Sequence, residues 1–259
     1  MRNSIGVLST FILLAMIVGC GALQPEKKLI SMKPNIDVAA NGISVLIIEV
    51  APSQGELGEQ LTQFGKPLED EPLISKLEQE GIHVRIIAAS DITELVSSFG
   101  EVMNKEIVWH GQMVDWRDIH QRKVLRQGML ISREKVPYFI RRGYLSLLAR
   151  SWLIGREDGL FMYLQTMPTW HIPRSVTLGF DQAKTPLQSN VFQDISVEVL
   201  LQDGEALVFA VELPREASPE EQLDAEPTAV RFGEALMGAP VTRDIVSLLV
   251  IEANILPRQ

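Results

Sequence analysis

The sequence contains few of the side chains on which catalysis and metal binding depend. It holds one cysteine, Cys20, and four histidines in 259 residues. A single cysteine cannot form a disulfide within the chain. The sequence also lacks a Gly-x-Ser-x-Gly motif and a glycine-rich phosphate-binding loop. Their absence removes the usual signatures of serine hydrolases and of nucleotide-binding proteins.

Positive charge is also scarce. The chain has 24 Lys and Arg residues against 33 Asp and Glu, a net charge of −9 at neutral pH. An acidic chain of this kind argues against nucleic acid as a partner and against a basic patch that docks on anionic lipid. Hydrophobic residues make up 46% of the chain, which is enough for a packed core and excludes wholesale disorder.

No apolar run is long enough to cross a bilayer as a helix. The N-terminal run, Ile5 to Gly19, has 15 residues, whereas a spanning helix needs about 20. Arg2 precedes this run and the small residue Gly19 ends it. A basic start, a short apolar segment and a small residue before the cleavage point are typical of a secretory signal peptide. An uncleaved N-terminal anchor helix is the alternative.

The segment Ile17-Val18-Gly19-Cys20 closely resembles the lipobox of bacterial lipoproteins. The resemblance implies that residues 1–19 are a signal peptide and that Cys20 is acylated, with palmitate or a similar chain. It places the protein in the cell envelope, anchored to a lipid membrane. Gly21 after the cysteine implies the outer membrane, on its periplasmic face. Acylation would also remove a lone thiol that is a liability in an oxidising compartment.

Removal of residues 1–19 would leave 240 residues with a net charge of −10, because Arg2 is the one charged residue removed. Residues 20–41 are polar and contain Pro25 and Pro34, which predicts a lipidated, flexible tether. Two further segments follow, a small α/β unit over 42–105 and a larger β-rich domain over 106–259.

The predicted α/β unit begins with Ile43–Val50, an apolar, β-branched run whose near-continuous hydrophobicity predicts a strand buried on both faces. Asp70, Pro72 and Gly81 mark the cap, the first turn and the end of a helix. Further elements are expected at 56–64 (helix), 82–89 (strand) and 91–100 (helix).

The second segment has the closely spaced short strands and Gly-containing turns of an antiparallel sheet, sandwich or open barrel. We therefore predict an α+β fold, in which a small α/β unit precedes a larger antiparallel β domain. An acidic, proline-containing loop is expected at 214–228. The expected strands are 107–109, 128–132, 136–140, 144–151, 159–166, 175–180, 192–201, 206–212 and 245–255.

Two histidines and two aspartates lie within eleven residues and are the candidates for a metal site: His110, Asp115, Asp118 and His120. Their spacing matches no known metal signature, so a polar surface connection is the competing interpretation. His171 is expected in a loop, with no nucleophile beside it. No cofactor is predicted.

The C-terminal part, about residues 159–258, remotely resembles a secretin-type β domain. The resemblance lies in Gly159–Pro168, in the turn Gln202-Asp203-Gly204-Glu205 with the apolar strand after it, and in the closing apolar strand 245–256 with Pro257 and Arg258. The 240 mature residues are too few for a full ring-forming secretin, so the resemblance implies an accessory lipoprotein. The whole chain also resembles uncharacterised envelope lipoproteins of planctomycete-like bacteria.

These observations favour a non-catalytic, membrane-anchored envelope lipoprotein that binds protein partners, for example in a secretion or pilus-type assembly. Two alternatives remain open. One is a metal-dependent hydrolase that uses the His110, Asp115, Asp118 and His120 cluster. The other is a small-ligand-binding lipoprotein, which would require a closed apolar cavity in the β domain.

Overall fold

The computed structural model describes residues 41–52, 57–124, 128–140, 143–172, 188–212, 229–238 and 245–256. All of them belong to one compact unit, Ile36–Gln259. The predicted signal peptide, Cys20 and nearly all of the tether lie outside the described residues. So do the expected strand at 175–180 and the acidic loop at 214–228.

The fold is built around an antiparallel five-stranded sheet, here called sheet A, in the order β2-β11-β13-β1-β3. The strand β1 pairs with β13 from the far end of the sequence, with Val45 opposite Ile251. The strands are β1 (Gly42–Pro52), β2 (His83–Ala88), β3 (Gly100–Gly111), β11 (Glu205–Glu212) and β13 (Val246–Asn254).

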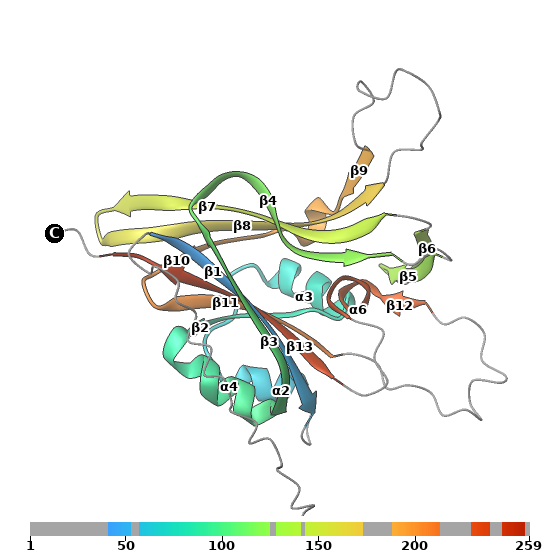
Figure 1. Ribbon diagram of the computed structural model, residues 1–259, viewed down its shortest axis with the longest axis horizontal. Coiled ribbons are helices and arrows are strands. Elements are labelled where there is room, and N and C mark those ends of the chain that lie inside the picture. Colours follow the sequence, from blue (N-terminus) through green and yellow to red (C-terminus); the bar gives the residue numbers. More distant parts are fainter. Residues whose placement is uncertain are drawn as a thin grey trace, which may run out of the picture. The chain divides into compact units, whose positions relative to one another are not determined.

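A second antiparallel sheet, sheet B, packs against sheet A, and a small sheet C lies beside them (Figure 1). Sheet B has the order β10-β8-β7-β4, with β9 paired to β8, and sheet C has the order β12-β5-β6. The strands of sheet B are β4 (Met113–Lys123), β7 (Tyr144–Arg156), β8 (Gly159–Ile172), β9 (Gln188–Val191) and β10 (Val197–Leu201). Those of sheet C are β5 (Met129–Arg133), β6 (Val136–Ile140) and β12 (Val230–Arg231).

The two faces of sheet A are buried against different layers, which explains the continuous hydrophobicity of β1. Val45 and Phe209 belong to the core shared with sheet B, where they join Leu147 and Leu164. The alternate residue Ile48 belongs to a second core with Leu61 and Phe99, from the helices on the other face. Burial of β1 on both faces, as predicted, is therefore confirmed.

Two helices, α2 (Leu57–Thr62) and α4 (Ile92–Phe99), cover the outer face of sheet A, and α3 (Glu71–Gln79) and α6 (Phe232–Met237) lie at the other face (Figure 1). The predicted cap of α3 is present, because Asp70 accepts a hydrogen bond from the N–H of Leu73 at 3.0 Å. Short 3₁₀ turns, η1 (Ala89–Asp91) and η2 (Gln193–Ile195), complete the described elements. The predicted α+β class with an antiparallel sandwich is confirmed.

The structure differs from the prediction between residues 100 and 123. A pair of long strands, β3 and β4, replaces the short strand at 107–109 and the polar connection after it, and the chain turns at Gly111, where φ is +65°. Both strands lie at sheet edges, where apolar and polar side chains are exposed alike, as Val102, Met103 and Val114 show. This mixture conceals the alternation that marks a half-buried strand. The expected segment boundary at 105/106 falls inside β3, and strands from both sides of it pair within sheet A.

Candidate functional site

The four residues of the candidate metal site do not come together. The pairing of β4 with β7 is irregular between Asp118 and His120, so that Asp118 lies opposite Leu148 and His120 lies opposite Leu147. Adjacent residues of β7 point to opposite faces of the sheet. The irregularity therefore places Asp118 on the outer face of sheet B and His120 on the inner face.

On the inner face, His120 contacts the C-terminal end of helix α6. Its Nε2 lies 3.0 Å from the carbonyl oxygen of Leu236. Arg122, two residues on, donates from Nη1 to the carbonyl oxygens of Glu234 and Ala235 at 2.6 and 3.0 Å. These carbonyls belong to the last turn of α6, where few intrahelical donors are available. The carbonyl of Glu234 also accepts a hydrogen bond from the N–H of Gly238 at 2.9 Å. Burial lowers the pKa of His120, and Arg122 adds to that effect.

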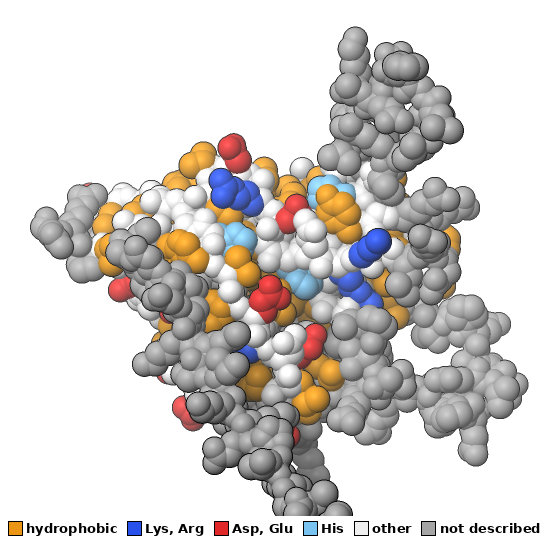
Figure 2. Space-filling view, viewed as in Figure 1, with side chains coloured by type: hydrophobic (Ala, Val, Ile, Leu, Met, Phe, Trp, Pro, Cys, Tyr) orange, Lys and Arg blue, Asp and Glu red, His pale blue; other side chains and the backbone are white. Residues whose placement is uncertain are grey.

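The other two candidates lie apart from this pair. His110 is in β3, where burial, followed by repulsion from Arg117, lowers its pKa. Asp115 is exposed on β4. Figure 2 shows histidine side chains in separate patches on this face of the molecule. Among the described residues, no group of three or more His, Cys, Asp or Glu side chains is placed to hold a metal ion.

Asp118 instead approaches His171, which lies in strand β8 rather than in the expected loop. His171 Nε2 is 3.0 Å from Ser146 Oγ and 3.8 Å from Asp118 Oδ1, and its ring stacks on Tyr144 with centroids 4.6 Å apart. A serine, a histidine and an aspartate from three strands thus meet, an arrangement that the sequence did not reveal because it depends on strand pairing.

The geometry of these three side chains is not that of a nucleophilic triad. In a triad the serine and the carboxylate contact different ring nitrogens, so that the carboxylate orients the base. Here both approach Nε2, and Nδ1 of His171 is buried without a hydrogen-bond partner among the described residues. Ser146 is also fully buried, so a substrate could not reach its hydroxyl. The cluster is therefore a packed polar contact between strands.

Further along the same outer face, a row of aromatic and polar side chains forms what we call the aromatic ladder: Trp116, Arg150, Trp152, Tyr163 and Gln165. The guanidinium carbon of Arg150 lies 4.8 Å from the ring centroid of Trp116 and 5.4 Å from that of Trp152. Trp152 in turn packs on Tyr163, with centroids 4.4 Å apart. All five side chains are partly exposed.

Strand pairing assembles this ladder. Leu147 and Ala149 of β7 point into the core, so Arg150 and Trp152 project outward. Their partners on β8 are Gln165 and Tyr163.

Hydrogen bonds hold the centre of the ladder in place. Arg150 Nε donates to Gln165 Oε1 at 2.8 Å, and the Tyr163 hydroxyl donates to the same oxygen at 3.4 Å. Burial, followed by a hydrogen bond with Glu198, raises the pKa of Tyr163. The arginine is therefore fixed between two indole rings, so that it loses little conformational entropy when a partner binds.

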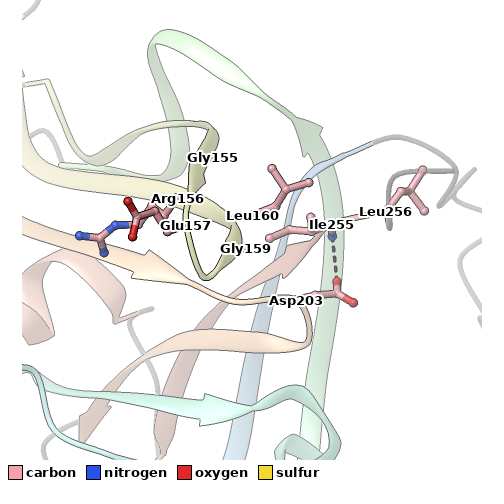
Figure 3. Close-up of a pocket in the computed structure, with 8 residues that line it drawn as sticks. All are labelled: Gly155, Arg156, Glu157, Gly159, Leu160, Asp203, Ile255 and Leu256. Carbon is pink, nitrogen blue, oxygen red and sulfur yellow. Dashed lines mark hydrogen bonds between the residues drawn. The ribbon is translucent and has the colours of Figure 1, made fainter.

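A cavity of about 530 Å³ lies at one end of the sheets, between the β7–β8 turn and the end of β13 (Figure 3). Arg156, Glu157 and Asp203 line it together with Leu160 and Ile255. Asp203 is engaged, since its Oδ1 accepts a hydrogen bond from the N–H of Ile255 at 2.9 Å. The cavity is open and partly charged, so it does not match the closed apolar cavity that small-ligand binding would require.

Comparison with models of known protein families finds no match, and comparison with curated proteins finds no significantly similar sequence. None of the helices in the described ranges is long and apolar enough to span a membrane.

Proposed function

We propose that this protein is a non-catalytic lipoprotein of the cell envelope that binds a protein partner through the aromatic ladder on sheet B. The observation that carries the proposal is the packing of Arg150 between Trp116 and Trp152. Tryptophan, tyrosine and arginine are the residues that most often dominate binding energy at protein interfaces. The outer face of a sandwich sheet is ordinarily polar, so an aromatic row there marks a surface suited to a partner.

The membrane anchor in this proposal is the acylated Cys20. The lipobox resemblance supports it, as does the lack of any other cysteine in the chain. Replacement of Cys20 by Ala should block processing or release the protein from membranes, measured by fractionation of cells. Unchanged membrane attachment of the variant would remove the anchor from the proposal.

The partner surface can be tested by photo-crosslinking in native membranes. A photoreactive phenylalanine at position 163 should give one discrete adduct, because Tyr163 lies at the end of the ladder. The same probe at position 102 is the matched control, since Val102 is exposed on β3 of sheet A. The combined change Arg150→Ala and Trp152→Ala should abolish the adduct from position 163. Equal adducts from both positions, or an adduct unaffected by these changes, would contradict the proposal.

The alternatives receive less support. The hydrolase hypothesis requires His110, Asp115, Asp118 and His120 at one metal, yet Asp118 and His120 project from opposite faces of sheet B. A partner within a secretion or pilus-type assembly remains part of the proposal through the secretin-like segments, and the mass of the cross-linked adduct would identify it.

A further inference from the structure

The β5–β6 hairpin exposes apolar side chains on both faces of its edge strand. Val136, Tyr138 and Phe139 are 63%, 39% and 48% exposed, and Pro137 between them is exposed as well. Alternate residues of a strand point to opposite faces, so one of the two faces would ordinarily be polar here. After the charged turn residues Glu134 and Lys135, β6 therefore exposes four successive side chains that are apolar except for the Tyr138 hydroxyl. That hydroxyl accepts a hydrogen bond from Asn190 at 3.2 Å, and the Tyr138 ring packs on Trp170 with centroids 5.9 Å apart.

The backbone edge of β6 is not suited to strand addition. β6 lies at the edge of sheet C and is five residues long. Pro137 has no N–H, and a proline on an edge strand disfavours pairing with another chain. What this hairpin offers to a partner is therefore its side chains.

The hairpin is held firmly in this exposed position. Its two turn residues, Glu134 and Lys135, have φ values of 49° and 63°. Residues other than Gly, Asn and Asp rarely adopt such a backbone conformation. The buried carboxylate of Glu80 accepts a hydrogen bond from the N–H of Glu134 at 2.9 Å. Arg133 packs over the ring of Phe192 at 4.5 Å and pairs with Asp194. These contacts hold the turn, and with it the start of the exposed strand β6, in place.

We propose that this hairpin inserts its apolar side chains into the interface of the bilayer that carries the anchor, an inference that rests on the acylation of Cys20 proposed above. Twenty residues separate Cys20 from Asn41, a contour of about 70 Å. A tether of this length holds the hairpin at a high effective concentration near the membrane. A weak apolar contact is then sufficient, and aromatic side chains are favoured at the depth of the head groups.

The tether and the hairpin leave the domain at different ends of the sheets. The N–H of Leu256 donates to Asn41 Oδ1, so the tether joins the domain where β13 ends. Figure 1 shows the β5–β6 hairpin at the other end of the sheets. On a zwitterionic bilayer such as phosphatidylcholine the attraction is apolar and should depend little on salt.

Spin labels on the full acylated chain in phosphatidylcholine vesicles test this inference. A new cysteine is the one free thiol once Cys20 is acylated, so Val136→Cys can be labelled and compared with Val114→Cys, whose parent side chain is 73% exposed on β4. The label at 136 should be about ten-fold less accessible to a water-soluble nickel complex than the label at 114. Addition of Phe139→Asp should remove most of that protection.

Each other outcome overturns the inference in a recognisable way. Equal accessibility at 136 and 114, on a chain whose mass shows the acyl groups, rejects the hairpin contact and leaves the anchor intact. Absence of acyl mass on Cys20 rejects the anchor and the hairpin contact together. Protection of position 136 in native membranes, but not in protein-free vesicles, shows that the hairpin binds a protein instead of lipid.

Discussion

The carboxylate of Glu80 and the backbone N–H of Glu134 form a 2.9 Å hydrogen bond across 54 residues of sequence. Glu80 ends helix α3 and is 2% exposed, and its Oε2 has no hydrogen-bond partner among the described residues. Burial raises the pKa of Glu80 above its ordinary 4.5, although the N–H of Glu134 and the charge of Arg133 oppose that rise. The residue that holds the hairpin turn is thus a buried acid whose charged form is disfavoured by its burial.

Replacement of Glu80 by Gln should make the domain more stable at neutral pH than the parent chain. Because the pKa is raised in the folded state, the stabilisation from this group is fully present below pH 4.5 and is lost as pH rises through the raised value. The amide keeps an acceptor for the N–H of Glu134 and cannot ionise. The melting temperature of Glu80→Gln should therefore exceed that of the parent by an amount that increases from pH 4 to pH 8. Each kcal/mol of difference in stability corresponds to about 2–4 °C. A difference that shrinks with pH would contradict this account.

Replacement of Arg122 by Ala should destabilise the domain by about 1–3 kcal/mol, because two carbonyls of α6 each lose a charge-assisted hydrogen bond. The carbonyl of Glu234 keeps the N–H of Gly238 as a donor, so the loss falls mainly on that of Ala235. Urea unfolding of the full chain measures the loss. Lys123→Ala is the matched control, since Lys123 is the next residue and is exposed. Equal losses in both variants would show that the contact with α6 contributes nothing.

His120 should make the domain less stable in mild acid. Its pKa is lowered in the folded state by burial, so its contribution is present above the ordinary value of 6.5 and is lost as pH falls towards the lowered value. The His120→Gln variant retains an N–H donor for the carbonyl of Leu236 and cannot titrate. Between pH 7.5 and pH 5 the melting temperature should fall more steeply for the parent than for this variant. An equal fall in both would show that His120 is not the source of the acid sensitivity.

Ser146 should not react with a fluorophosphonate probe in the folded protein. The hydroxyl is fully buried, and the Ser146, His171 and Asp118 geometry leaves the histidine unable to act as an oriented base. Labelling is followed by mass spectrometry beside a known serine hydrolase. Probe incorporation that disappears in Ser146→Ala would contradict this prediction and indicate a catalytic role for the cluster.

Several elements were predictable because their signals are local. The cap at Asp70 and the stop at Gly81 bounded α3, and the apolar run from 43 to 50 indicated a strand buried on both sides. The edge strands β3 and β4 were missed or shortened because a solvated strand does not need alternating hydrophobicity. The metal hypothesis then placed His110 and His120 together on sequence distance alone, without knowledge of the strands that separate them.

The sequence by itself determined the acidic character of the chain, its single cysteine, its lipobox-like N-terminus and most of its strands, since these depend on composition and on neighbours in the chain. Only the tertiary structure decided that Trp116, Arg150, Trp152 and Tyr163 meet on one face, and that Asp118 and His120 lie on opposite faces. The physical reason is strand register: a shift of one residue moves a side chain from one face of a sheet to the other. Long-range pairing, such as that between β1 and β13, sets that register.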